Sequence, residues 1–178
     1  HPFGWVWHAA APDGHEYFVA EYQVPKEKIS AHAGAIKDIR RGYGLEPSAV
    51  WLDPSAWANR GEFESPAFEL GEYGINCGKA QNDRIGGWNR LEELLTSKVD
   101  ECTCPVVRDG SPRLMVFDRC RELAKQIRNA KIREGTDDVE KVNDDLIDPA
   151  RYVVMSRPFY RLPEREGGAV TDRVERYV

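Results

Sequence analysis

The sequence has few of the residues that build disulfide frameworks or zinc sites. It contains four cysteines and four histidines in 178 residues, with no Cys-x-x-Cys pair and every histidine in the first fifth of the chain. A zinc site needs Cys or His ligands at short, regular spacing. Reduced cysteines in a cytoplasmic protein are therefore the better interpretation.

Membrane and targeting segments are also missing from the pattern. A membrane-spanning helix needs about 18 consecutive apolar residues, and no apolar run in the sequence is that long. The opening residues, His-Pro-Phe-Gly-Trp-Val-Trp, lack the basic start of a signal peptide and an initiator Met. We expect a fragment of a longer protein that makes no contact with a membrane.

Two common catalytic motifs do not occur. There is no Gly-x-x-x-x-Gly-Lys-Ser/Thr loop and no Gly-x-Ser-x-Gly elbow, so we expect neither an ATP motor in this chain nor a hydrolase triad. The net charge of −5 argues against a protein that coats nucleic acid by bulk charge. It leaves room for a nuclease, because clustered metal-binding acids lower the sum while a local basic face holds the DNA.

The order of the expected elements predicts one α/β domain. Phe3–Ala11 is apolar on both faces and Pro12-Asp13-Gly14 is a turn, so Phe3–Ala11 and His15–Val24 form an antiparallel hairpin. After Pro25 the apolar period becomes helical. The remaining expectations are a helix over Lys26–Arg41 ended by Gly42 and Gly44, strands over Ala49–Asp53, Glu72–Ala80 and Pro112–Phe117, a loop with some turn of helix over Trp57–Glu69, and helices over Asp83–Ser97, Arg119–Glu134 and Asp145–Ser156.

This order predicts a mixed central sheet flanked by helices. We expect the domain to span residues 1–158, with Asp53 on a strand beside the first strand. Residues 159–178 form a polar C-terminal tail that carries little of the fold.

Asp53 is the first candidate site residue. It ends a short apolar strand, and a carboxylate at the carboxyl end of a strand in an open α/β sheet points into the crevice where ligands bind. The alternative is that Asp53 only starts a turn, since Asp-Pro-Ser is turn-prone. Both interpretations stay open at this point.

Acidic residues at the start of the last helix are the second candidate. Asp144, Asp145 and Asp148 are spaced so that two of them share a helix face. Capping of the helix N-terminus explains one acid, worth about 0.3–1 kcal/mol. A divalent metal such as Mg²⁺ or Mn²⁺, which prefers oxygen ligands, would explain the set.

A third candidate is the cationic face of the helix expected over Arg119–Glu134. Arg121, Lys125 and Arg128 lie on it. They either contact DNA phosphates or form an ordinary solvated helix surface, and salt dependence would distinguish the two.

Four segments taken together resemble the C-terminal nuclease domain of phage terminase large subunits. They are the segment from Trp51 to Ala56, the segment from Asn82 to Gly87 that opens a helix, Arg113–Phe117 followed by a helix, and the segment from Asn143 to Tyr152. The resemblance implies the ribonuclease H-like fold up to about Pro158.

The same resemblance implies a function. It suggests a metal-dependent endonuclease that cuts double-stranded viral DNA during bacteriophage genome packaging, with two Mg²⁺ or Mn²⁺ ions. Asp53 and Asp148 would be catalytic, and Asp53, Asp145 and Asp148 would bind metal. The family's first acid lies on its opening strand, and we expect it to be missing here because the chain starts at His1. This chain alone would then bind metal weakly and cut DNA slowly, if at all.

The same resemblance implies binding partners, and it leaves one alternative to the nuclease function. By resemblance the partners are double-stranded DNA, the terminase ATPase domain, the small terminase subunit and the portal protein, in the cytoplasm of the infected bacterial host. The alternative is a non-catalytic ribonuclease H-like module that docks on a portal or other packaging partner. Metal binding that depends on Asp53 would separate the two hypotheses.

Overall fold

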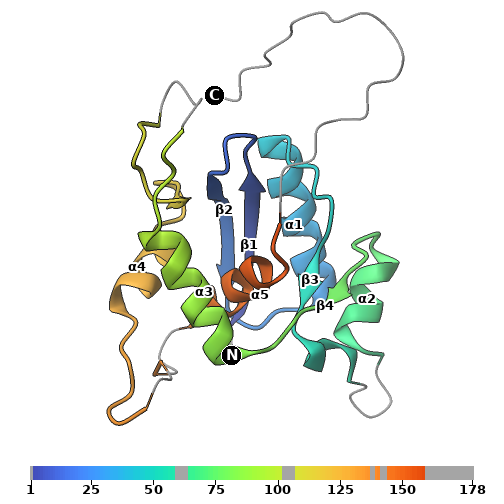
Figure 1. Cartoon of the computed structure of the whole chain (residues 1–178). Helices are drawn as coiled ribbons and strands as arrows, with labels where there is room; N and C mark the ends of the chain where they lie inside the picture. The colour runs from blue at the N-terminus through green and yellow to red at the C-terminus, as the bar shows by residue number, and fades with distance from the viewer. Residues whose placement is uncertain (1, 59–63, 102–106, 137–138, 141–143, 159–178) are drawn as a thin grey trace, which may run out of the picture.

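The computed structural model describes residues 2–58, 64–101, 107–136, 139–140 and 144–158. Strands lie at the centre of the molecule, and helices surround them (Figure 1). The elements, in chain order, are β1 (Phe3–Ala10), β2 (Glu16–Val24), α1 (Ile29–Tyr43), β3 (Trp51–Leu52), the 3-10 turn η1 (Pro54–Trp57), α2 (Pro66–Glu72), β4 (Gly78–Lys79), α3 (Arg84–Thr96), β5 (Leu114–Val116), α4 (Arg121–Asn129) and α5 (Ile147–Met155).

The opening hairpin is confirmed. β1 pairs antiparallel with β2 from Phe3↔Val24 to Ala10↔Glu16, with a bulge between Trp7 and His8. The turn is held by Asp13, whose carboxylate accepts the His15 N–H at 3.1 Å. Gly14 has a φ of 86°, a backbone conformation that favours glycine.

Hydrophobic clusters cover both faces of this hairpin, as the apolar run of β1 predicts. One cluster joins Phe18, Leu91, Leu114, Leu123 and Ala150 from β2, α3, β5, α4 and α5. The other joins Trp5 and Trp7 to Ile36 of α1 and Leu70 of α2. The mixed α/β fold class is therefore confirmed, and helices lie on both sides of the strands.

The prediction that the strand leading to Asp53 lies beside the first strand is wrong. The described strands form two sheets, one with the order β1-β2-β5 and one that pairs β3 with β4 in parallel. β3 is not hydrogen-bonded to β1 within the described part of the chain. The apolar pattern identifies a strand but carries no information about which strand edge it meets, because that choice depends on contacts distant in sequence.

Several element boundaries also differ from expectation. Of the strand expected over Glu72–Ala80, only the two residues of β4 form a strand. Helix α2 covers the end of the segment expected to be a loop and the first residue of this expected strand. Ser65 caps α2 by accepting the Phe68 N–H at 3.3 Å, and Pro66 stands at its first position. This capping serine followed by proline is visible in the sequence as a helix start. The residues after it, however, show no clean helical spacing of apolar side chains.

The cationic helix is shorter than its pattern predicts. α4 ends at Asn129, and the chain then turns so that Ile132 forms an isolated antiparallel bridge with Val139. Gly44, with φ 64°, ends α1 as expected, whereas α1 continues through Gly42. The expected C-terminal tail lies outside the described residues. Among those described, no helix combines the length and the apolar composition that crossing a membrane requires.

Candidate metal centre and nucleic-acid interface

The acids near the C-terminus gather at the beginning of α5. Asp144 and Asp145 precede the helix, and Asp148 lies in its first turn. The Asp148 N–H donates to the Asp144 carbonyl at 3.0 Å, which closes this first turn. A carboxylate here is stabilised by the unpaired N–H groups and the dipole of the helix.

Two arginines balance these acids, and sequence reasoning missed both of them. Arg151 is only 2% exposed, and its Nη2 lies 2.5 Å from Asp148 Oδ1. Arg84, at the start of α3, lies 3.3 Å from Asp144 and 3.8 Å from Asp148. The spacing of Asp148 and Arg151 by three residues was a signal for their pairing. Arg84 had no such signal, since it comes from another helix.

The side chain of Arg151 packs closely against the first turn of α3. A Cβ on Gly87 would lie 3.1 Å from the Arg151 Cβ and 3.2 Å from its Nη1, so the absence of a side chain at Gly87 makes room for the guanidinium. That nitrogen also lies 3.5 Å from the carbonyl oxygens of Asp83 and Arg84 at the start of α3. Arg151 thus ties α3 to the acidic end of α5.

Asp53 caps the η1 turn and also reaches α5. Its carboxylate accepts the Ser55 N–H at 2.7 Å, a longer contact from the Asn82 side chain at 3.4 Å, and a short hydrogen bond from the Tyr152 hydroxyl. Burial alone would raise the pKa of Asp53. The bonds from Ser55 and Tyr152 and the charge of Arg151 outweigh it and lower that pKa.

Tyr152 lies between the two acidic segments. It stands one helical turn after Asp148 on α5, and its hydroxyl donates to Asp53, 99 positions earlier in the chain. Burial, the bond to Asp53 and the charges of Asp148 and Asp53 raise the pKa of the Tyr152 phenol. The strand-end carboxylate and the acidic helix start therefore meet around one phenol.

Asp145 is held from the opposite side by side chains of β2 and α4. Gln23 donates to its carboxylate at 3.1 Å, and Gln126 donates to Gln23 at 3.0 Å. Gln126 also accepts the Leu146 N–H at 2.9 Å. Burial and the charges of Asp144 and Asp148 raise the pKa of Asp145.

A metal centre can be tested against this donor set. Carboxylate oxygens from Asp53, Asp145 and Asp148 are the donor type that hard divalent ions prefer. Within the described residues, however, no group of three or more His, Cys, Asp or Glu side chains is placed to hold a metal ion. The donor chemistry fits a divalent ion, while guanidinium groups balance the acids in this arrangement.

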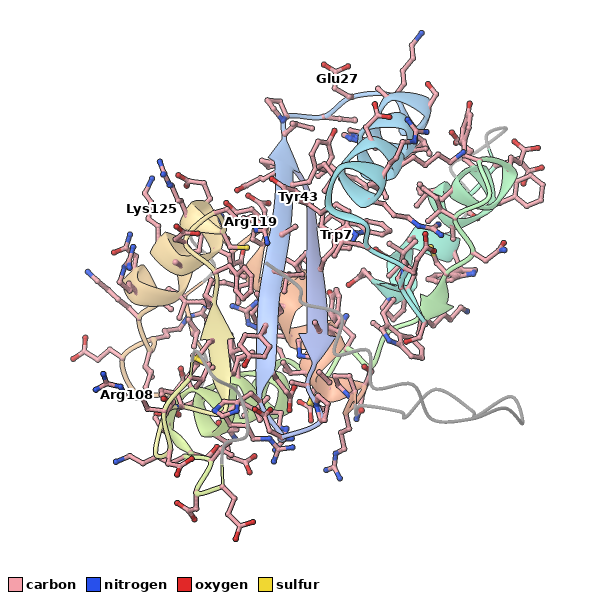
Figure 2. The ribbon with its side chains drawn as sticks, turned by 90° about the horizontal axis from the view of Figure 1, so that it is seen from above. Trp7, Glu27, Tyr43, Arg108, Arg119 and Lys125 are labelled. Carbon is pink, nitrogen blue, oxygen red and sulfur yellow. The ribbon has the colours of Figure 1, made fainter. Side chains whose placement is uncertain are left out.

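The cations expected to contact DNA lie on the exposed face of α4. Arg121, Lys125 and Arg128 are exposed, whereas Leu123 and Gln126 of the same helix are buried. Lys125 forms an exposed ion pair with Glu122 at 3.4 Å. Figure 2 shows Lys125 pointing away from the body of the molecule. This face is free to meet a polyanion, and contact with DNA stays a prediction.

Comparison with solved structures shows which proteins share this fold. The P22 large terminase nuclease domain matches over 88% of this chain and 75% of that chain, with a TM-score of 0.65 and 18% identity. The nuclease domain of the large terminase of bacteriophage SPP1, solved with bound Mn, matches over 88% of this chain and 78% of that chain, with a TM-score of 0.60 and 17% identity.

These matches confirm the expected resemblance at the level of the fold. The chain has the ribonuclease H-like fold of phage large-terminase nuclease domains. No protein-family model matches the sequence. No curated protein matches it either.

Proposed function

We propose that this chain is a divalent-metal-dependent endonuclease domain that cuts double-stranded viral DNA during genome packaging. The observation that supports it best is the meeting of Asp53 and the acidic start of α5 around Tyr152. The likeness of the fold to two phage terminase nuclease domains supports the same reaction class.

Asp53 and Asp148 would be the catalytic metal ligands, with Asp145 at the edge of the site. The bound Mn in the SPP1 domain supports Mg²⁺ or Mn²⁺ as the ion. Asp53, Asp145 and Asp148 would hold such ions, which would supply activation of a water molecule and stabilisation of the leaving oxygen of a phosphodiester. Neighbouring carboxylates stay ionised together only when positive charge compensates them.

The chain's own side chains have positioning roles in this proposal. Tyr152 holds the Asp53 carboxylate in one orientation through its hydroxyl. Arg151 forms an ion pair with Asp148 from a buried position, and Arg84 forms one with Asp144. Gln23 orients Asp145. Arg121, Lys125 and Arg128 would bind phosphates of the duplex and position it.

The biological setting follows from the same proposal. The substrate is double-stranded DNA, and the other partners are the terminase ATPase domain, the small terminase subunit and the portal protein. The reaction takes place in the cytoplasm of the infected bacterium.

The test is plasmid cleavage with and without Mg²⁺ or Mn²⁺, combined with calorimetry of metal binding. We expect Asp53→Asn and Asp148→Asn to abolish cleavage and weaken metal binding. Asp38→Asn on α1, whose side chain is 74% exposed and pairs with Arg41, is the matched control and should leave both unchanged.

Two results would overturn the assignment. One is metal-dependent cleavage that survives both substitutions. The other is a metal-soaked crystal structure in which the Asp53 and Asp148 carboxyl groups stand more than about 10 Å apart, beyond shared coordination at bonds of about 2.0–2.6 Å. The absence of any metal binding that depends on Asp53 would instead favour the docking module.

A further inference from the structure

Gln126 is the one polar side chain that α4 buries within the described structure. It is 7% exposed, whereas Lys125 and Arg128 on the same helix are exposed. A buried amide needs a donor for its oxygen and an acceptor for its nitrogen. Gln126 has both, because its Oε1 accepts the Leu146 N–H at 2.9 Å and its Nε2 donates to Gln23 Oε1 at 3.0 Å.

These bonds form a closed ring with Asp145. Gln23 of β2 donates from its Nε2 to the Asp145 carboxylate at 3.1 Å. The ring therefore leaves the chain at the Asp145 side chain and returns to it at the next backbone N–H, that of Leu146. It joins β2, α4 and the segment before α5, which are distant in sequence.

The ring has only one possible direction. A backbone N–H group only donates, and an ionised carboxylate only accepts. The oxygen of Gln126 must therefore face Leu146, which leaves its nitrogen to donate to Gln23. Because that bond uses the oxygen of Gln23, the nitrogen of Gln23 faces Asp145. The N–H at the start of α5 thus sets the orientation of both amides.

We propose that Gln126 is a positioning residue for the Asp145 carboxylate. It acts through Gln23, whose amide it holds with the N–H group toward Asp145, and it ties this acid to the helix whose exposed face carries the cations. The inference rests on the proposed function in that Asp145 contributes to the binding of a divalent ion. Hydrogen-bond partners of a metal ligand fix its orientation, and their loss weakens metal binding about 10–100-fold.

Gln126→Glu separates this role from a merely structural one. The side chain keeps its size and an oxygen that accepts the Leu146 N–H, but it has no N–H group to donate to Gln23. Gln23 then turns its own N–H group toward the new carboxylate, and its carbonyl oxygen faces Asp145. We expect the affinity for Mn²⁺ to fall about tenfold or more. Charge alone would have the opposite effect, since an added carboxylate attracts a cation.

A double-mutant cycle tests whether Gln126 acts through Gln23. Calorimetry with Mn²⁺ compares Gln23→Ala, Gln126→Ala and the double variant. Each single substitution should weaken binding about tenfold, and the double variant should bind no more weakly than Gln23→Ala. Asn129→Ala, which removes an exposed amide from the last residue of α4, is the matched control and should bind Mn²⁺ like wild type.

A measurement on the metal-free protein distinguishes failure of this inference from failure of the proposed function. The NMR signals of the Gln23 side-chain amide should shift in Gln126→Glu and stay in place in Asn129→Ala. If wild type binds no Mn²⁺, the role in metal binding is wrong together with the proposed function, and these signals still decide whether Gln126 orients Gln23. Unchanged Gln23 signals, Mn²⁺ affinity of Gln126→Glu equal to or above that of wild type, or additive losses in the cycle would each overturn the inference.

Discussion

Tyr152 is the residue on which the two acidic segments converge. Its hydroxyl bonds Asp53, and its pKa is raised by burial and by the carboxylates of Asp53 and Asp148. A protonated phenol is a donor, and this donor lowers the pKa of Asp53. The phenol therefore contributes to stability through the ionised form of its partner.

Tyr152→Phe should destabilise the domain by about 1–2 kcal/mol at neutral pH, since it removes a hydrogen bond to a charged group. A lowered carboxylate pKa stabilises the fold above its unfolded value and loses that contribution as the pH falls through the folded value. The difference from wild type should therefore shrink below pH 3.8, the ordinary pKa of Asp53. Urea unfolding at pH 7 and at acid pH measures both.

Tyr43→Phe is the matched control for this substitution. Tyr43 is 51% exposed, and its ring, which the substitution retains, lies 4.3 Å from the Arg119 guanidinium (Figure 2). Equal stability of Tyr152→Phe and wild type at neutral pH would show that the Tyr152–Asp53 bond contributes nothing.

Burial should also make two thiols unreactive. It raises the pKa of Cys77 to about 11 and that of Cys120 to about 12. Because the thiolate is the reactive form, alkylation by iodoacetamide at pH 8 should be slow at both residues in the folded protein and fast in guanidinium. Peptide mass spectrometry gives the rates. Modification of folded Cys120 at the rate of an unfolded cysteine would contradict this prediction.

At the scale of elements, α4 shows how a distant side chain sets where a helix begins. Glu21 of β2 accepts the N–H groups of Glu122 and Leu123 at 2.9 and 2.8 Å. These are unpaired donors of the first helical turn, which a residue just before the helix usually satisfies. The start of α4 is thus fixed by the packing of α4 against β2.

Reversal of charge on α4 tests the DNA-binding prediction. The variant Arg121→Glu/Lys125→Glu should weaken duplex binding and reduce the slope of log K against log salt by about 0.9 for each lost phosphate contact. Fluorescence anisotropy over a range of salt concentrations measures this slope.

The matched control is Lys37→Glu/Arg41→Glu, which reverses two exposed cations on α1. It changes the net charge by the same amount and should leave the slope closer to that of wild type. An unchanged slope for the α4 variant would mean that this helix presents an ordinary solvated surface.

At the scale of the whole molecule, the hairpin of β1 and β2 connects the two hydrophobic clusters, because it contributes side chains to both. Phe18 of β2 belongs to one cluster, and Ala20 of the same strand belongs to the other. A loss of packing in either cluster therefore loosens the strand that supports both. We expect the domain to unfold in a single transition.

Leu114→Ala tests this coupling. Leu114 is 1% exposed in the cluster with α3 and α5, and its truncation should cost about 2–5 kcal/mol. Circular dichroism and tryptophan fluorescence should shift to the same lower denaturant midpoint. Separate midpoints for the two signals would show that the clusters unfold independently.

The sequence by itself determined the elements whose information is local. The hairpin followed from the double-faced apolar run of β1 and the Pro12-Asp13-Gly14 turn, and α5 followed from its acids and apolar face. The position of Asp53 at the end of a strand and the cluster of acids around Asp148 also singled out these residues as candidates. These features depend on neighbours a few positions apart, so periodicity and turn chemistry report them.

Only the tertiary structure decided which distant groups face each other. It paired β3 with β4, it placed Arg84 of α3 against Asp144, and it hydrogen-bonded Gln23 of β2 to Asp145. Each of these contacts joins segments tens of residues apart. Their free energy depends on the packing of whole helices and strands, and no local pattern records that packing.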